Sequence, residues 1–135
     1  MIRPAAALPA LAWALLILVL CLLPGKDLPD WSWMDLFSLD KPVHALLFAV
    51  LTVLIPRAWN IADTDGRRAM RVYWTAAVMA TAYGVSTEWM QHAFVPDRTA
   101  DVNDMIANAL GALLGVVYLK RRDGARNSTK GRKDV

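Results

Sequence analysis

Hydrophobic residues make up 56% of this 135-residue chain, and its mean hydropathy is +0.32. Soluble domains contain about 45–50% apolar residues, so the composition is typical of a membrane protein with one compact domain. The net charge is +3, and the single cysteine excludes an intrachain disulfide framework.

The first apolar run covers residues 4–23 without a charged residue and predicts a helix over about 4–24. A helix of about 20 residues is long enough to span one bilayer core. No small-x-small cleavage site follows, because the run ends in Pro24 and Gly25. We therefore expect a retained first transmembrane helix rather than a signal peptide.

Two further apolar runs predict a second helix over 42–59 and a third over 72–94. Pro42 suits the first turn of a helix, where its missing N–H makes no difference. Residues 60–71 are expected to form a loop, because Asp63 to Gly66 has the residue types of a turn.

The fourth helix is predicted over 101–119, polar in its first two turns and apolar afterwards. Residues 120–135 form a basic tail that contains Gly and Ser, which we expect to be disordered and cytoplasmic. The predicted fold is an all-α membrane protein, a four-transmembrane-helix bundle over residues 1–119.

The distribution of basic residues predicts the orientation of this bundle. If both termini are cytoplasmic, only Lys26, Lys41 and Arg98 of the 15 Lys and Arg residues lie on the outer side. Cytoplasmic segments of membrane proteins carry an excess of Lys and Arg. The sequence therefore predicts that both termini face the cytoplasm.

With this topology, the unusual polar residues gather at the outer ends of three helices, and on each helix they recur at spacings of three or four positions, as from Lys41 and Asp40 to His44. They are Asp40, Lys41 and His44 on the second helix, Glu88 and Gln91 on the third, and Asp101, Asp104 and Asn108 on the fourth. The last stripe continues to Gly111 and Gly115, a pair that lets helices approach closely. We expect a polar pocket that opens outward.

Glu88 lies at least one turn inside the third apolar run. An ionisable residue in the apolar zone costs roughly 2.5–3.5 kcal/mol on insertion scales, so such residues are functional candidates. The cost also predicts a partner for Glu88, for which Lys41, Arg98 and His44 are the candidates.

Several of these residues also have a structural interpretation. Asp101 or Asp104 can cap the fourth helix, where negative charge suits the N-terminus. Asn108 can join neighbouring helices, and Gly111 and Gly115 are packing residues first. The basic tail is more typical of a topology determinant that contacts anionic lipids than of a nucleic-acid site, so no nucleic-acid partner is expected.

The order and spacing of these residues resemble the VanZ-like family of small bacterial integral membrane proteins. The residues that carry the resemblance are Asp40-Lys41-x-x-His44, Glu88-x-x-Gln91, and the series Arg98, Asp101, Asp104, Asn108, Gly111 and Gly115. The resemblance implies a multi-pass protein of the bacterial cytoplasmic (inner) membrane with a role in the cell envelope. Because the family's named member is associated with resistance to the lipoglycopeptide teicoplanin, it also implies a link to glycopeptide resistance.

The first functional hypothesis is a protein that binds an amphiphile headgroup, such as a lipid-linked cell-wall precursor or a lipoglycopeptide, among membrane lipids. Arg98, Lys41 and His44 would meet its phosphate or carboxylate groups. The hydroxyls and amides of the headgroup would be met by Asp104, Asn108 and Gln91.

The second hypothesis is a membrane-embedded hydrolase or transferase that acts on a lipid headgroup. Glu88 would be its general acid or base, His44 would orient Glu88 or shuttle protons, and Arg98 would steady an anionic transition state. No cofactor is expected. A metal site at His44, Glu88 and Asp104 is a variant, which no His-Glu-x-x-His spacing supports.

A transporter or channel is the third hypothesis. It is disfavoured because the first helix and the inner halves of the third and fourth offer no polar path across a membrane. The identity of the ligand, the occurrence of a reaction and the oligomeric state do not follow from the sequence.

Overall fold

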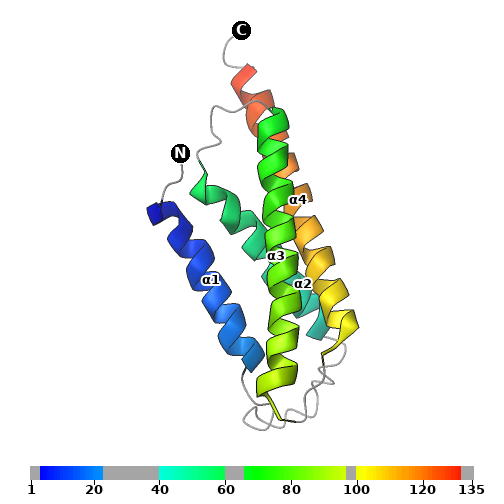
Figure 1. Cartoon of the computed structure of the whole chain (residues 1–135). Coiled ribbons are helices and arrows are strands. Elements are labelled where there is room, and N and C mark those ends of the chain that lie inside the picture. Colours follow the sequence, from blue (N-terminus) through cyan, green and yellow to red (C-terminus); the bar gives the residue numbers. More distant parts are fainter. Residues whose placement is uncertain (1–3, 23–39, 60–65, 97–99, 132–135) are drawn as a thin grey trace.

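The structure, a computed structural model, describes residues 4–22, 40–59, 66–96 and 100–131. The described residues form four α-helices and one short 3-10 helix: α1 Pro4–Leu22, α2 Asp40–Leu54, η2 Ile55–Ala58, α3 Gly66–Phe94 and α4 Val102–Gly131. Successive α-helices run in alternating directions, so the beginning of α1 and the end of α4 lie at the same end of the bundle (Figure 1). The predicted all-α bundle of four helices is therefore confirmed for the described residues.

Three of the described helical segments are long and apolar enough to cross a membrane: 4–22, 41–58 and 102–129. The 29-residue helix α3 is more polar, because it begins with several arginines and buries Thr87, Glu88 and Gln91. That α3 also crosses the membrane stays a prediction, as does the side on which the termini lie.

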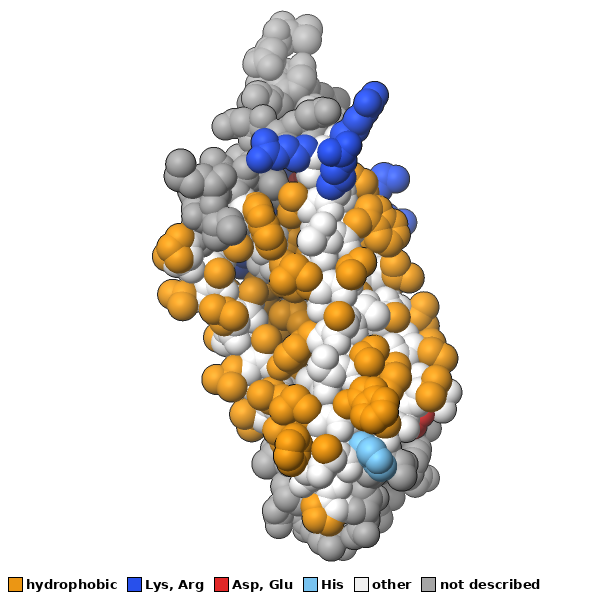
Figure 2. All heavy atoms as spheres, viewed as in Figure 1, with side chains coloured by type: hydrophobic (Ala, Val, Ile, Leu, Met, Phe, Trp, Pro, Cys, Tyr) orange, Lys and Arg blue, Asp and Glu red, His pale blue; other side chains and the backbone are white. Residues whose placement is uncertain are grey.

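Large apolar side chains cover the outside of the bundle. Leu11, Leu46, Val78 and Leu114 are each at least 60% exposed. Hydrophobic side chains cover the middle of the face in Figure 2, whereas Lys and Arg gather toward its upper end. An apolar surface of this extent is unfavourable in water and suits contact with lipid.

Helix α4 packs most closely against the parallel helix α2, through two glycines. A Cβ atom at Gly111 would overlap the backbone carbonyl of Ala45. One at Gly115 would lie 2.7 Å from Cβ of Thr52 and 2.8 Å from the carbonyl oxygen of Ala49. Since these distances are shorter than van der Waals contact, the close approach of α2 and α4 depends on glycine at both positions.

Side-chain donors attach α1 to the rest of the bundle. Trp13 Nε1 donates a hydrogen bond to the carbonyl oxygen of Leu47 in α2 at 2.9 Å. The Tyr83 hydroxyl in α3 donates to the carbonyl oxygen of Ala14 at 2.7 Å. About one turn further along α1, Ile17 is fully buried, so α1 is part of the core rather than a separate anchor.

Helix α3 begins earlier than the sequence predicts. Residues 66–71, which we expected to lie in a loop, are helical from Gly66 onward. Arginine is a good helix former, and Arg67, Arg68 and Arg71 are exposed, so the helix extends past the apolar run at little cost. The loop prediction is wrong for these residues, and residues 60–65 lie outside the described part of the chain.

Helix α4 continues beyond Leu119 to Gly131, so the prediction of a disordered tail is wrong over most of its length. Lys, Arg and Ala favour a helix there. The hydroxyl of Tyr73 in α3 also donates a hydrogen bond to the carboxylate of Asp123, while Arg122 Nη2 lies 3.5 Å from Asp123 Oδ1. The hydrogen bond between Tyr73 and Asp123 ties the C-terminal extension of α4 to α3.

Candidate functional site

Four of the predicted polar side chains meet inside the bundle, at the end opposite the first turn of α1 and the last turn of α4 (Figure 1). His44 comes from the beginning of α2, Glu88 from the last turns of α3, and Asp104 and Asn108 from the first turns of α4. Their exposed fractions are 8%, 1%, 5% and 1%, respectively. We refer to these four side chains as the polar cluster.

Within the polar cluster, His44 is oriented by Asn108. The Nδ1 atom of His44 lies 3.0 Å from Oδ1 of Asn108. An amide oxygen only accepts hydrogen bonds, so in this orientation of the amide the imidazole Nδ1–H is the donor. The lone pair of a neutral imidazole then lies on Nε2.

Glu88 is only partly satisfied by its surroundings. Its Oε2 atom accepts a hydrogen bond from the backbone N–H of Asp101 at 3.3 Å. Its Oε1 atom has no hydrogen-bond partner in the part of the chain that the structure describes, and neither has Nδ2 of Asn108. Buried polar atoms without partners are rare in folded proteins, and each is a place where a ligand or ion can bind.

His44, Glu88 and Asp104 are also close enough to act together. One nitrogen of the imidazole and one oxygen of each carboxylate all lie within 4.8 Å of one another. The structure thus brings His44 to Glu88, whereas Lys41, three residues earlier on the same helix, is exposed. Arg98, the third predicted partner of Glu88, lies outside the described residues.

Other predicted site residues have different positions. Nε2 of Gln91 donates a hydrogen bond to the carbonyl oxygen of Cys21 at 2.7 Å, which joins α3 to α1 rather than to the polar cluster. Oδ1 of Asp101 accepts a hydrogen bond from the N–H of Asn103 at 2.7 Å, so this side chain caps α4. The side chain of Asp40 lies outside the described part of the structure.

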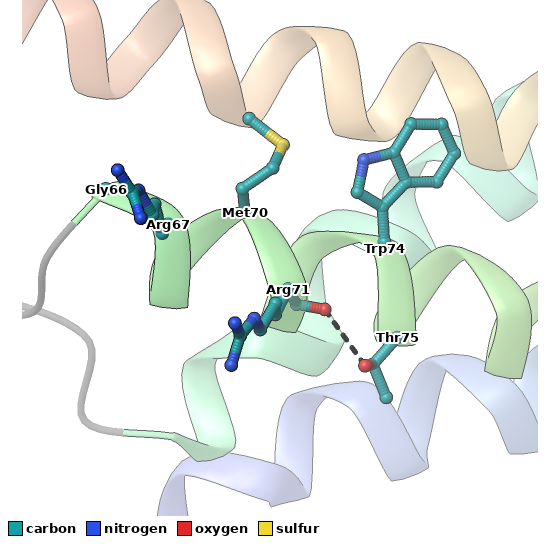
Figure 3. Close-up of a pocket in the computed structure, with 6 residues that line it drawn as sticks. All are labelled: Gly66, Arg67, Met70, Arg71, Trp74 and Thr75. Atoms are coloured by element: carbon teal, nitrogen blue, oxygen red, sulfur yellow. Dashed lines mark hydrogen bonds between the residues drawn. The ribbon is translucent and has the colours of Figure 1, made fainter.

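Two hollows of the described structure lie away from the polar cluster. One hollow, of about 730 Å³, lies at the beginning of α3. Figure 3 shows that Met70 and Trp74 extend toward α4 there, whereas Arg71 leaves α3 on another side. A second, mainly apolar hollow of about 410 Å³ lies between α3 and α4, beside Ala77 and Ala109. Neither hollow is lined by the polar cluster, and the predicted outward-opening pocket stays a prediction.

A model of the VanZ/LLP1 family matches residues 21–122, which include α2, α3, the polar cluster and most of α4. The chain belongs to the VanZ/LLP1 family. The resemblance inferred from the polar residues is thereby confirmed.

An uncharacterized protein of Schizosaccharomyces pombe is 34% identical to this VanZ/LLP1 chain over 87 residues, which are 62% of the chain and 50% of the relative. The match therefore spans half the length of the yeast protein. No solved structure matches the chain.

Gly84 is a residue of this VanZ/LLP1 chain whose part in the site we did not predict. A Cβ atom there would lie 2.8 Å from Nδ2 of Asn108 and 3.0 Å from Cε1 of Phe48. Glycine at this position leaves the room that Asn108 occupies beside His44. The signal in the sequence is its spacing, since Gly84 precedes Glu88 by four residues and therefore lies on the same helix face.

The arrangement offers two kinds of chemistry. The carboxylates of Glu88 and Asp104 accept hydrogen bonds or bind a cation, and the imidazole of His44 accepts or donates a proton. In a site shielded from water, such interactions are stronger than at an exposed surface. The polar cluster is therefore suited to binding a polar group or an ion, or to acid–base chemistry.

Proposed function

We propose that this VanZ/LLP1 protein is an integral protein of the bacterial cytoplasmic (inner) membrane that binds an amphiphile headgroup with its polar cluster. The observation that carries the proposal is the carboxylate of Glu88, which is 1% exposed and has one oxygen without a hydrogen-bond partner among the described residues. A headgroup donor would satisfy this oxygen.

The chemistry of the polar cluster favours hydroxyl, amide or amine groups, because ionised carboxylates only accept hydrogen bonds. Lipid-linked sugars and peptides carry many such donors. The sequence-based role of Gln91 in meeting the headgroup is dropped, since its amide is bonded to Cys21. Lys41 and Arg98 remain the proposed contacts for a phosphate or carboxylate of the same ligand.

The charge distribution supports an orientation with both termini cytoplasmic. Lys and Arg gather at one end of the molecule in Figure 2, the end at which α1 begins and α4 ends, and the polar cluster lies near the other end. Because basic residues favour the cytoplasmic side, the polar cluster belongs at the outer leaflet.

Membership of the VanZ/LLP1 family supports a role in the cell envelope. A lipid-linked cell-wall precursor is one candidate ligand, and a lipoglycopeptide such as teicoplanin is another, which would connect the protein to antibiotic resistance. Since a relative occurs in a yeast, we propose a class of headgroup rich in hydroxyl and amide donors rather than one bacterial compound.

Mass spectrometry of lipids that co-purify with the protein tests the proposal. We expect a headgroup enriched over the bulk membrane in wild-type protein and reduced about tenfold in Glu88→Gln, corresponding to loss of a charge-assisted hydrogen bond of about 1.5 kcal/mol. Asp123→Asn is the matched control, because it makes the same acid-to-amide change at the far end of α4. Equal lipid profiles in the wild type and Glu88→Gln would contradict the proposal.

A membrane-embedded hydrolase or transferase acting on a lipid headgroup is the second candidate, favoured by the proximity of His44 to Glu88 within 4.8 Å. Glu88 would act as general acid or base, and His44 would orient it or carry the proton. Purified protein would then turn over a member of a lipid-precursor panel, and Glu88→Gln would lose that turnover. Absence of turnover by the wild type on the whole panel would contradict the enzymatic function, and only the binding function would remain.

A further inference from the structure

We propose that His44, Glu88 and Asp104 form a binding site for one divalent transition-metal ion. The three ligands come from α2, α3 and α4, and their donor atoms lie within 4.8 Å of one another. Metal–ligand distances for nitrogen and carboxylate oxygen are about 2.0–2.2 Å, so the three side chains would close in on a bound ion.

The donor set selects the kind of ion. One imidazole nitrogen and two carboxylate oxygens suit Zn²⁺, Mn²⁺ or Fe²⁺, whereas sites for Ca²⁺ and Mg²⁺ are built from oxygen alone. A divalent ion also balances the charge of two carboxylates. Three protein ligands leave at least one coordination position open, as in catalytic rather than structural zinc sites.

The hydrogen bonding of Glu88 supports a ligand at the polar cluster. The Glu88 side chain is 1% exposed, and the backbone N–H of Asp101 holds Oε2 while Oε1 has no hydrogen-bond partner in the described part of the chain. Leaving a buried carboxylate oxygen unsatisfied is unfavourable. Coordination to a cation would give this oxygen a partner and remove the free-energy cost of leaving it unsatisfied.

Asn108 gives His44 the support that metal-binding histidines usually have. Metal-ligating imidazoles typically donate their other N–H to a carbonyl or carboxylate, which fixes the tautomer and the ring orientation. In this chain Oδ1 of Asn108 lies 3.0 Å from Nδ1 of His44, so Nε2 would be the coordinating atom when Nδ1 carries the proton. The missing Cβ at Gly84 makes room for Asn108 in this role.

The inference rests on the proposed function, because the ion would occupy the same polar cluster, and it deepens that function. An acidic cluster repels phosphate, whereas an ion with an open position can coordinate a phosphate oxygen. The proposed ligand is thus a headgroup that carries a phosphate beside its hydroxyl or amide donors, and its phosphate would reach the polar cluster through the ion.

Metal content of the purified full-length chain tests the inference. The protein is prepared with an affinity tag that contains no histidine, stripped with EDTA, incubated with Zn²⁺, Mn²⁺ or Co²⁺, desalted and measured by elemental mass spectrometry. We expect about one ion per wild-type chain for at least one metal, and less than about a tenth of that for Glu88→Gln and Asp104→Asn, each of which loses an anionic ligand. Asp123→Asn should load like the wild type.

Two further readouts keep the result independent of folding defects. Co²⁺ bound through the cluster should give a visible absorption band that is absent from Glu88→Gln. Should the ligand variants fail to fold, Asn108→Ala keeps all three ligands and should weaken metal affinity by about 10–100-fold. Wild-type protein that takes up less than about a tenth of an ion per chain would overturn the inference, as would equal loading of all folded variants.

The outcome for the metal can be separated from that for the headgroup. Metal loading without an enriched lipid would support the ion site and contradict the proposed function. An enriched lipid on a metal-free chain would support the proposed function and contradict the ion site.

Discussion

One oxygen of the Glu88 carboxylate accepts a hydrogen bond from the backbone N–H of Asp101. The other has no hydrogen-bond partner among the described residues. The place of Glu88 inside an apolar run marked it as a candidate from the sequence, because ionisable residues are unfavourable there. The run did not decide whether Lys41 or His44 would meet it. In the structure His44 is buried and Lys41 is exposed, so the packing of α2 brings His44, and not Lys41, close to Glu88.

Gly84→Ala is expected to disturb the polar cluster directly. The added methyl group would lie 2.8 Å from Nδ2 and 3.0 Å from Cβ of Asn108, so Asn108 must move away from His44. Inserting a methyl group into a packed core costs about 1–3 kcal/mol. We expect a loss of that size in unfolding experiments in detergent, together with weaker binding of whichever ligand the cluster holds.

Gly124→Ala is the control for this change, because nothing lies within 4 Å of the Cβ position at Gly124. Alanine inside a helix is about 0.5–1 kcal/mol more favourable than glycine, so the control should be neutral or stabilising. If Gly84→Ala were as stable as Gly124→Ala, Asn108 would not depend on the space at Gly84.

At the scale of helices, the parallel pair α2 and α4 holds the site together. Both helices begin at the end of the bundle that carries the polar cluster, and their glycine contact brings His44 to Asn108. Helix α3 adds Glu88 from the opposite chain direction. The site therefore depends on the distance between α2 and α4 as much as on its own side chains.

Gly111→Ala is expected to be more damaging than Gly84→Ala. The new Cβ would overlap the backbone carbonyl of Ala45, which cannot rotate away as a side chain can. The two helices must separate, and we expect destabilisation above the roughly 1–3 kcal/mol of side-chain overpacking. Thermal unfolding of the detergent-solubilised protein, compared with Gly124→Ala in the same helix, would measure it. Equal stability of the two variants would show that α2 and α4 do not need this contact.

At the scale of the whole molecule, the four helices place the first turn of α1 and the last turns of α4 at one end and the polar cluster near the other (Figure 1). The orientation of this arrangement in the membrane determines whether the cluster meets the outer leaflet. We infer from the basic residues that it does.

Cysteine labelling of intact cells would determine the orientation. After Cys21→Ala removes the native thiol, Lys41→Cys and Gly124→Cys introduce exposed cysteines at opposite ends of the bundle. A membrane-impermeant maleimide should label Lys41→Cys in intact cells, and Gly124→Cys only after permeabilisation, because basic segments stay cytoplasmic. The reversed pattern would place the polar cluster on the cytoplasmic side.

The ends of the helices show where sequence-based prediction stopped being reliable. Apolar runs identify the segments suited to lipid, but a helix continues wherever its residues favour helical backbone. The arginines after Gly66 and the basic residues after Leu119 are polar and yet good helix formers, so α3 begins earlier and α4 ends later than predicted. Contact between Tyr73 and Asp123 adds a tertiary reason for the longer α4.

The sequence by itself determined the class of this protein, its four helices and its family, because apolar runs and the spacing of rare polar residues are local properties. Only the tertiary structure decided which polar residues meet. It directs Gln91 to Cys21 in α1 and brings His44, Glu88, Asp104 and Asn108 together in one buried cluster. The physical reason is that such contacts depend on the rotation and separation of packed helices, which here follow from the close approach at Gly111 and Gly115.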